Sequence, residues 1–414
     1  MRDLLTASFL TLLLACGAKT GLYVPDADVD VGVDAGMDAG VDAGPPPPLC
    51  VEVPRDAGPV EVRLAVPARL AVVDVMFVLD ATASMLDEIE TIRRRLVDVV
   101  VPGIRGAIPD AAFGVALTGE FPVLPHGLPP VQPYDLRAPI TTDALRVQSA
   151  LERLPTWDNL DEPEAQVEGL YQVATGEGLE PFIPPSAGCP SGGSGGACFR
   201  RDALPVVMVI TDAPMNNGPT GMGAYAFEGP HTWEQTRRAL VALEAKLIGL
   251  GARDAFSLSP MPDLRAAALA TGAVNGAGGP LAFDIGSRGG GLGGRIVEAV
   301  QQLADGTPLD IDAIVQDVPG DAIDATLLVR QVRPRSASPP DGVAAVEADR
   351  FVGVRPGTVL TFELVLDAAA APPSTETLAV RARVVFRAFR RSRIDRREVL
   401  LIIPGDDGGS CESL

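Results

Sequence analysis

The segment Asp80-Ala81-Thr82-Ala83-Ser84 places one carboxylate and two hydroxyl groups at alternating positions along the chain. It follows an apolar run, residues 70–79, that reads as a buried strand, and it precedes residues 85–101, which read as a helix. Alternating side chains on such a strand-to-helix turn point the same way, and oxygen ligands suit a hard divalent cation. Asp and Ser also cap free N–H groups at helix starts. The segment therefore predicts either half of a cation site or a helix cap.

Two further acidic positions lie downstream. The segment Asp158-Asn159-Leu160-Asp161-Glu162-Pro163-Glu164 holds four carboxylates in seven residues, and a nearby positive charge would relieve their repulsion. Acids at a helix start also favour the positive end of its dipole, which is the simpler interpretation. Asp212 follows the apolar run 204–210. Because ligands of parallel α/β sheets bind at the carboxyl ends of the strands, Asp80 and Asp212 are expected at the same edge.

The elements that must position these groups follow from the pattern of apolar residues. Between residues 70 and 305, apolar strands alternate with helices, which predicts an α/β domain with a mostly parallel sheet flanked by helices. From residue 306 onward, short alternating strands punctuated by Pro and Gly predict an antiparallel β-sandwich. If Cys50 pairs with Cys411, the strand expected at residues 60–66 belongs to this sandwich. The α/β domain is then inserted in the sandwich; otherwise the sandwich follows it.

Composition narrows the classes of function. The chain has 414 residues, a formal net charge of -20 and 47% hydrophobic residues, enough for two or three domains with sizeable cores. A strongly acidic chain is a poor nucleic-acid binder, so no nucleic-acid partner is expected. The two histidines, His126 and His231, are expected at the surface, and no nucleophile–base pair is visible. We therefore assign no catalytic residues and do not expect an enzyme.

The N-terminus is typical of an exported protein. Residues 1–16 form a short apolar stretch ending in Leu13-Leu14-Ala15-Cys16, which resembles a bacterial lipoprotein signal with its lipobox. The thiol of Cys16 would carry the lipid, although an ordinary secretory signal with a chance cysteine is the alternative. A lipid anchor predicts a protein of the bacterial cell envelope, at the outer membrane or periplasmic face, that contacts the membrane through the anchor only.

Four cysteines remain if Cys16 is lipidated, an even number suited to an oxidising compartment. Of the three pairings open to them, the economical one joins Cys189 to Cys198 across a Gly-rich loop and Cys50 to Cys411 at the ends of the folded region. The expected organisation is a signal peptide (1–16), a disordered Asp/Ala/Gly/Pro linker (17–49), a first sandwich strand (50–69), an α/β domain (70–305), a β-sandwich (306–405) and a tail (406–414).

The acidic motifs resemble those of von Willebrand factor type A domains, and most closely those of integrin β-subunit I-like domains. DATASMLDE (residues 80–88) is similar to their Asp-x-Ser-x-Ser-Met-x-Asp-Asp, and NLDEPE (residues 159–164) is similar to their Asn-Leu-Asp-x-Pro-Glu. VMVITDAP (residues 207–214) is similar to their strand ending in Thr-Asp-Ala. The resemblance covers residues 60–404, and it implies a von Willebrand-type sheet followed by a sandwich placed like the integrin hybrid domain. The integrin stalk and transmembrane helix are absent.

The resemblance also implies metal sites. At the centre, a metal-ion-dependent adhesion site would hold Mg²⁺ or Mn²⁺, directly or through water, with Asp80, Thr82, Ser84, Glu164 and Asp212. Two flanking Ca²⁺ sites would use the Ser84 backbone with Asp87 and Glu88, and Asn159, Asp161, the Pro163 carbonyl and Glu164. Asp87 and Glu88 equally suit the first turn of a helix.

The expected function is that of a surface-anchored, cation-dependent adhesion protein. Neutral hydroxyl ligands leave the cation charge incompletely balanced, so an open coordination position can capture a carboxylate on a protein or other macromolecule. Two alternatives stay open: a metal-dependent hydrolase that uses the cation as a Lewis acid, and a structural module whose metal sites only stabilise the fold.

Overall fold

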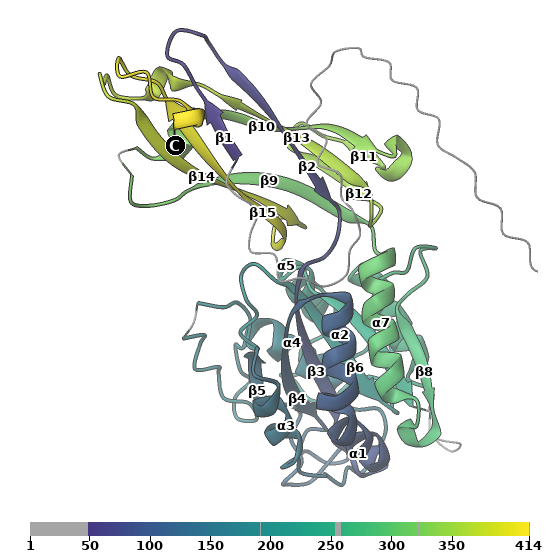
Figure 1. Ribbon diagram of the computed structural model, residues 1–414. Helices are drawn as coiled ribbons and strands as arrows, with labels where there is room; N and C mark the ends of the chain where they lie inside the picture. The colour runs from purple at the N-terminus through teal and green to yellow at the C-terminus, as the bar shows by residue number, and fades with distance from the viewer. Residues whose placement is uncertain (1–48, 191, 253–257, 322, 414) are drawn as a thin grey trace, which may run out of the picture. The chain divides into compact units, whose positions relative to one another are not determined.

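The computed structural model describes residues 49–190, 192–252, 258–321 and 323–413 (Figure 1). The predicted signal peptide, the lipidation site Cys16 and the linker up to residue 48 lie outside the described residues. In the part of the chain that is described, no helix combines the length and the apolar character needed to cross a membrane.

One sheet has six strands in the order β5-β4-β3-β6-β7-β8. Strand β3 pairs in parallel with both β4 and β6, and β6, β7 and β8 continue in parallel. The edge strand β5 runs antiparallel to β4. The six strands are β3 (Val72–Asp80), β4 (Asp110–Thr118), β5 (Asp135–Thr141), β6 (Leu204–Thr211), β7 (Lys246–Ala252) and β8 (Ala282–Gly286).

Apolar side chains of β3 enter two separate clusters. Val75 and Phe77 pack with α1, α2 and α7, whereas Met76 and Val78 pack with α4 and α5. Because successive strand side chains point to opposite faces, β3 is buried along its whole length, which fixes the position of its last residue, Asp80. The helices are α1 (Leu86–Arg95), α2 (Val101–Ala107), α3 (Ala144–Leu151), α4 (Gln166–Thr175), α5 (Trp233–Ala242), α6 (Met261–Ala270) and α7 (Leu292–Gly306).

The remaining strands form two sheets, in the orders β1-β15-β14-β9-β12-β11 and β10-β13-β2. Three phenylalanines join them: the Phe362 ring lies 5.2 Å from that of Phe351 and 5.4 Å from that of Phe386, centroid to centroid. These strands are β1 (Leu49–Glu52), β2 (Val60–Pro67), β9 (Leu309–Asp317), β10 (Val329–Ser338), β11 (Ala345–Val346), β12 (Arg350–Val354), β13 (Val359–Leu366), β14 (Leu378–Ala388) and β15 (Ser392–Ile403).

The structure corrects the predicted fold class. The sequence predicts an α/β protein with a von Willebrand-type, mostly parallel sheet flanked by helices, inserted in or followed by a β-sandwich. The chain is instead β-rich, with 35% strand and 26% helix, and its sheets are mixed. The antiparallel pairings of β9, β10 and β12–β15 supply long strands without intervening helices. Even in the six-stranded sheet, the edge strand β5 is antiparallel to its neighbour β4. The strand–helix alternation predicted for residues 70–305 therefore does not set the fold class of the whole chain.

Both predicted disulfides are formed. Cys50 of β1 bonds to Cys411 across 361 residues of sequence, with an S–S distance of 2.07 Å. Cys189 bonds to Cys198 across nine residues. Since the first bridge closes a very long loop, it restricts the unfolded chain far more than the second does. The prediction from cysteine spacing is thus confirmed.

An ion pair lies inside the six-stranded sheet. Asp74, near the start of β3, is fully buried, and its carboxylate accepts hydrogen bonds from the Arg200 backbone N–H (2.6 Å) and the Arg200 Nε (2.7 Å). The same guanidinium group reaches Asp110 through Nη1 at 2.6 Å. Burial raises the pKa of Asp74, and the charge of Arg200 opposes that rise. Arg200 is therefore the partner that permits an acid in this strand.

Candidate metal centre

Three neighbouring strands bring acidic residues to one edge of the six-stranded sheet. Asp80, the last residue of β3, pairs with Thr118 of β4, and Glu120 follows two residues later. On the other side, Leu79 pairs with Ile210 of β6, so that Asp212 lies just beyond the end of that strand. Carboxyl ends of parallel strands form the edge at which α/β sheets bind ligands. The predicted proximity of Asp80 and Asp212 is therefore present.

A continuous line of oxygen atoms runs from Asp80 to Asp212. The Thr82 hydroxyl donates to Asp80 Oδ1 at 2.6 Å, and the Thr82 backbone N–H donates to the same oxygen at 3.0 Å. Thr82 Oγ1 lies 3.1 Å from Ser84 Oγ, which donates to Asp212 Oδ1 at 3.2 Å. Asp80, Thr82 and Asp212 are buried, whereas Ser84 is exposed. The cluster is therefore enclosed by protein but reaches solvent at Ser84.

Glu164 joins this cluster from a third loop. Its backbone N–H donates to the Pro214 carbonyl at 3.0 Å, and its carbonyl accepts from Asn216 N–H at 2.7 Å, which ties it to the loop after β6. The residue is only 1% exposed, yet its carboxylate Oε2 has no hydrogen-bond partner among the described residues. A buried, unpaired carboxylate oxygen is costly and needs an explanation. A cation coordinated by Oε2 would provide one.

Two polar side chains that the sequence analysis did not select orient Asp80. The Thr211 hydroxyl donates to Asp80 Oδ2 at 2.7 Å. Gln166, at the start of α4, donates through Nε2 to Thr211 Oγ1 at 2.9 Å. These groups fix the direction of the carboxylate, as residues behind a metal ligand do. Thr211 adjoins Asp212 in sequence and could have been noticed; nothing in the local sequence pointed to Gln166.

The carboxylates of the cluster have elevated pKa values. Burial, followed by the charge of Asp80, raises the pKa of Asp212 to about 7. Burial and the neighbouring acids Asp80 and Glu120 raise the pKa of Glu164 well above its ordinary value. No lysine or arginine in the described ranges is recorded in an ion pair with Asp80, Glu164 or Asp212. Because these groups lack a positive partner, the donor set fits a divalent cation.

The acids after Ser84 fit two interpretations equally well. Asp87 and Glu88 lie in the first turn of α1, where acids favour the helix dipole. Asp87 is exposed, while Glu88 is buried and its pKa is raised, mainly by burial. A flanking cation site at Asp87 and Glu88 therefore stays a prediction.

The second predicted flanking group is more tightly assembled. Asn159 donates through Nδ2 to Glu164 Oε1, and Asp161 Oδ1 is buried without a hydrogen-bond partner in the described chain. The Pro163 carbonyl accepts from Asn216 Nδ2 at 2.8 Å, and the same amide donates to Glu120 Oε2 at 2.7 Å. Asn216, which the sequence analysis did not select, thus links the two sides of this group.

His126 belongs to the same group, contrary to the expectation that it is exposed. It is 9% exposed, its Nδ1 lies 2.8 Å from Asp161 Oδ2, and ligand atoms of Glu120, His126 and Asp161 lie within 4.8 Å of one another. The other histidine, His231, is also paired, with Nδ1 2.9 Å from Glu168 Oε2. Ca²⁺ prefers all-oxygen sites. An imidazole nitrogen here suits Mn²⁺ or Zn²⁺ better than the Ca²⁺ we expected.

Thr82 offers a test of the central ligand set. We expect Thr82→Ala to weaken Mn²⁺ binding about tenfold, as loss of one ligand or of its support commonly does, while Thr82→Ser retains wild-type affinity because the hydroxyl is kept. Isothermal titration with Mn²⁺ measures both. Equal affinity of the Ala and Ser variants would show that the hydroxyl is not a ligand.

Comparisons with known proteins give few clues. No protein-family model and no curated protein matches the chain. Among solved structures, the pilus adhesin SpaC from Lactobacillus rhamnosus GG in its open conformation aligns with a TM-score of 0.36 and 12% identity, over 84% of this chain and 45% of that one. Proximal thread matrix protein 1 from the mussel byssus aligns with a TM-score of 0.35 and 12% identity, over 61% and 51%. The chain thus spans about half the length of these proteins.

The family assignment made from the motifs is corrected by these comparisons. No family model matches, and the similar structures are a pilus adhesin and a thread matrix protein rather than a von Willebrand factor type A or integrin domain. The integrin-like identity, and with it the name of metal-ion-dependent adhesion site, is therefore dropped. At TM-scores near 0.36 the similar structures carry no argument about function either. The acidic cluster is a candidate only on its own geometry.

Proposed function

We propose that this chain is a surface-anchored binding protein that holds Mg²⁺ or Mn²⁺ at Asp80, Thr82, Ser84, Glu164 and Asp212 and uses it to capture a carboxylate on a protein partner. The observation that carries the proposal is the unpartnered, buried Oε2 of Glu164 beside a line of oxygen atoms that reaches solvent. Surface anchoring rests on the lipobox at Cys16.

The open side of the cluster explains why an external ligand would bind. Ser84 is exposed, so a cation held beside it faces solvent in that direction. Two of the proposed ligands are neutral hydroxyls, and hard cations take six or more oxygen ligands. A carboxylate from outside would complete the coordination. Such a charge-assisted contact is strong when water is excluded around it.

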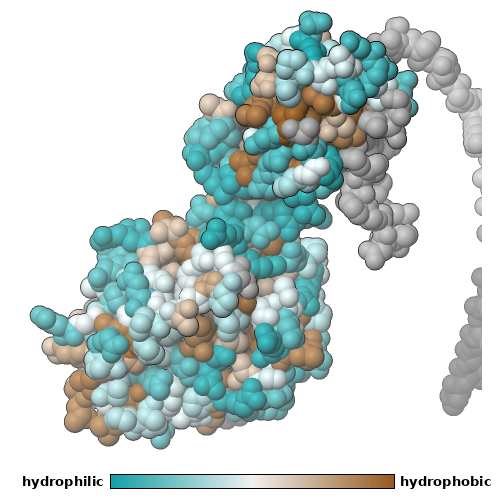
Figure 2. All heavy atoms as spheres, turned by 90° about the vertical axis from the view of Figure 1, so that its left-hand side faces the viewer, coloured by the Kyte–Doolittle hydropathy of each residue, from teal (hydrophilic) through white to brown (hydrophobic). Residues whose placement is uncertain are grey.

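Apolar side chains around the cluster can exclude that water. Segments after β3, β4, α3, β6 and β7 expose large hydrophobic residues, from 38% for Met222 to 67% for Leu124. Hydrogen bonds join these loops: Leu160 N–H donates to the His126 carbonyl at 2.9 Å, and Leu258 N–H donates to Glu162 Oε2 at 3.3 Å. Figure 2 shows brown, hydrophobic residues at the lower edge of the part that holds the six-stranded sheet. The apolar rim is formed by Leu86, Leu124, Leu128, Leu160, Met222 and Leu258.

The apolar rim supports a partner whose carboxylate lies beside apolar side chains. An exposed apolar patch rimmed by polar groups marks an interaction site. A carboxylate on a loop whose neighbouring side chains are bulky and apolar would contact the cation and the rim together. We therefore propose an Asp or Glu flanked by Leu, Ile or Phe as the recognised feature of the partner.

Peptide-coated beads test this function. Beads carrying Leu-Asp-Leu peptides should retain the wild-type protein in millimolar Mg²⁺ and release it in EDTA. Beads carrying Leu-Asn-Leu should not retain it, and Gly-Asp-Gly should retain less. Asp212→Asn, which removes a ligand charge without changing shape, should abolish retention. Retention that survives EDTA would contradict the proposal.

A further inference from the structure

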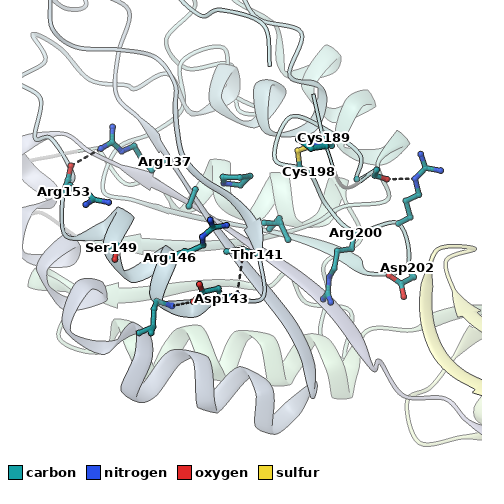
Figure 3. Close-up of a pocket in the computed structure, with 18 residues that line it drawn as sticks. Arg137, Thr141, Asp143, Arg146, Ser149, Arg153, Cys189, Cys198, Arg200 and Asp202 are labelled. Carbon is teal, nitrogen blue, oxygen red and sulfur yellow. Dashed lines mark hydrogen bonds between the residues drawn. A yellow bond between two sulfur atoms is a disulfide. The ribbon is translucent and has the colours of Figure 1, made fainter. Parts of the chain in front are cut away.

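A pocket separate from the metal centre lies on the β5 side of the six-stranded sheet. It has a volume of about 940 Å³ and opens between β5, α3 and the loop closed by the Cys189–Cys198 disulfide. Figure 3 draws Arg146 and Arg153 on one side of it and the disulfide and Arg200 on the other. Pockets of this volume are at the upper end of those that hold small ligands.

The charge of this pocket is opposite to that of the chain. Its lining includes five arginines and two aspartates, whereas the chain as a whole has a formal net charge of -20. Both aspartates have other partners: Asp143 accepts from Leu145 N–H at the start of α3, at 3.1 Å, and Asp202 bonds to Arg393, at 3.1 Å. The arginines are Arg137, Arg146, Arg153, Arg200 and Arg201.

Two of these arginines have side chains without a partner among the described residues. Arg200 is engaged by Asp74, Arg137 by Asp135 at 2.9 Å, and Arg201 donates to the Gly192 carbonyl at 2.6 Å. By contrast, no hydrogen bond or ion pair of the Arg146 or Arg153 guanidinium group occurs within the described residues. Two unpaired guanidinium groups in one hollow of an acidic protein point to an anionic ligand.

The positions of the unpaired arginines limit that ligand further. Arg146 lies in α3 and Arg153 follows its end, seven residues on, which corresponds to roughly 10 Å along a helix. Ser149 lines the pocket between them and adds a hydroxyl donor. Ile140 and Leu145 supply apolar surface to the same lining. The lining therefore matches two anionic groups joined by a spacer the size of a sugar ring or a short chain.

We propose that this pocket binds a ligand that carries two phosphate groups. A phosphate offers three acceptor oxygens and accepts paired N–H donors from Arg together with a hydroxyl donor, whereas one carboxylate offers two oxygens. The pocket supplies more donors than two carboxylates would use. The phosphates can belong to a free phosphorylated sugar or to a lipid headgroup. The proposal does not depend on the metal centre.

Calorimetric titration with glucose 1,6-bisphosphate tests the pocket, with succinate as a dicarboxylate probe, both in millimolar Mg²⁺. We expect wild-type protein to bind the bisphosphate and the double variant R146A/R153A to bind it at least about tenfold more weakly. The double variant R69A/R265A is the matched control, because it removes two exposed arginines without side-chain partners and changes the net charge equally. It should bind like wild type.

Co-sedimentation with phosphatidylcholine vesicles, with and without cardiolipin, whose headgroup carries two phosphates joined by glycerol, distinguishes the two sources of phosphate. Binding to the acidic vesicles that R146A/R153A loses indicates a lipid headgroup, and binding of the bisphosphate alone indicates a free sugar phosphate. Melting temperatures of all variants must match wild type. The proposal is overturned if wild type binds neither probe, if both double variants bind equally, or if succinate binds as tightly as the bisphosphate.

Discussion

Millimolar Mg²⁺ or Mn²⁺ should raise the melting temperature of EDTA-treated protein by about 5 °C, because a ligand at a hundred times its Kd stabilises the folded state by about 2.7 kcal/mol. The rise should be larger at about pH 8 than at about pH 5, since metal ligands must lose their protons to bind. Thermal unfolding followed by circular dichroism measures both effects.

The sign of the pH effect follows from the acids of the two groups. Burial raises the pKa of Asp212 from 3.8 to about 7 and that of Glu120 from 4.5 to about 8. Between the ordinary and the raised values, the folded state binds more protons than the unfolded state, so the free energy of unfolding falls as pH rises. Without cation, stability is therefore highest below the ordinary values and is lost through about pH 8. A bound cation favours the ionised carboxylates and should remove this loss.

Matched variants separate this effect from general charge screening. Asp212→Asn should lose most of the cation-induced rise, whereas Asp56→Asn, at an exposed acid outside the proposed ligand set, should keep it. A melting temperature unchanged by millimolar cation would refute the metal centre. A rise of equal size in the D212N variant would place the cation elsewhere.

Replacing Arg200 by Ala should lower the free energy of unfolding by about 3–5 kcal/mol, the cost of leaving a buried charge unpaired. Asp74 is fully buried in β3 and accepts two hydrogen bonds from Arg200, one of which comes from the side chain. Once the guanidinium group is removed, only the backbone N–H of residue 200 and the charge of Arg391 oppose the effect of burial, so the pKa of Asp74 rises further. The loss should grow as pH rises above the ordinary pKa of Asp74, because folding must then protonate or bury the charge.

Urea unfolding of wild type, R200A and R200A/D74N measures this loss. The double variant should recover part of it, because no charge remains to be buried. The exposed Arg265→Ala is the matched control and should change stability by less than about 0.5 kcal/mol. A loss no larger in R200A than in R265A would show that Asp74 does not depend on its arginine.

In the six-stranded sheet, the sequence pattern predicted the central strands but not the edge strand β5. The apolar run of residues 70–79 and the run of residues 204–210 predicted β3 and β6, and both strands are wholly buried. Strand β5 and its antiparallel direction were not predicted, because its half-buried residues lack the continuous apolar run of β3 and β6. The overall class was also wrong: antiparallel strands after residue 306 were part of the prediction, but their length, together with the antiparallel β5, makes the chain β-rich with mixed sheets.

The sequence also did not indicate that the arginines of the pocket between β5, α3 and the Cys189–Cys198 loop lie together. Arg137, Arg146 and Arg153 are spread along a strand, a helix and a turn, where single arginines normally reach into solvent. Arg200 and Arg201 lie about fifty residues further along the chain. Only folding places all five around one hollow, opposite the disulfide loop.

The sequence by itself determined what is local: the alternating oxygens of Asp80, Thr82 and Ser84, and the cysteine spacing that predicted both disulfides. Tertiary structure alone decided that Glu164 carries an unpartnered oxygen and that His126 and Glu120 lie beside Asp161. The physical reason is the sequence separation between the residues that interact. Spacing of a few residues is set by backbone geometry, whereas contacts between loops depend on which strands pair and how their ends are hydrogen-bonded.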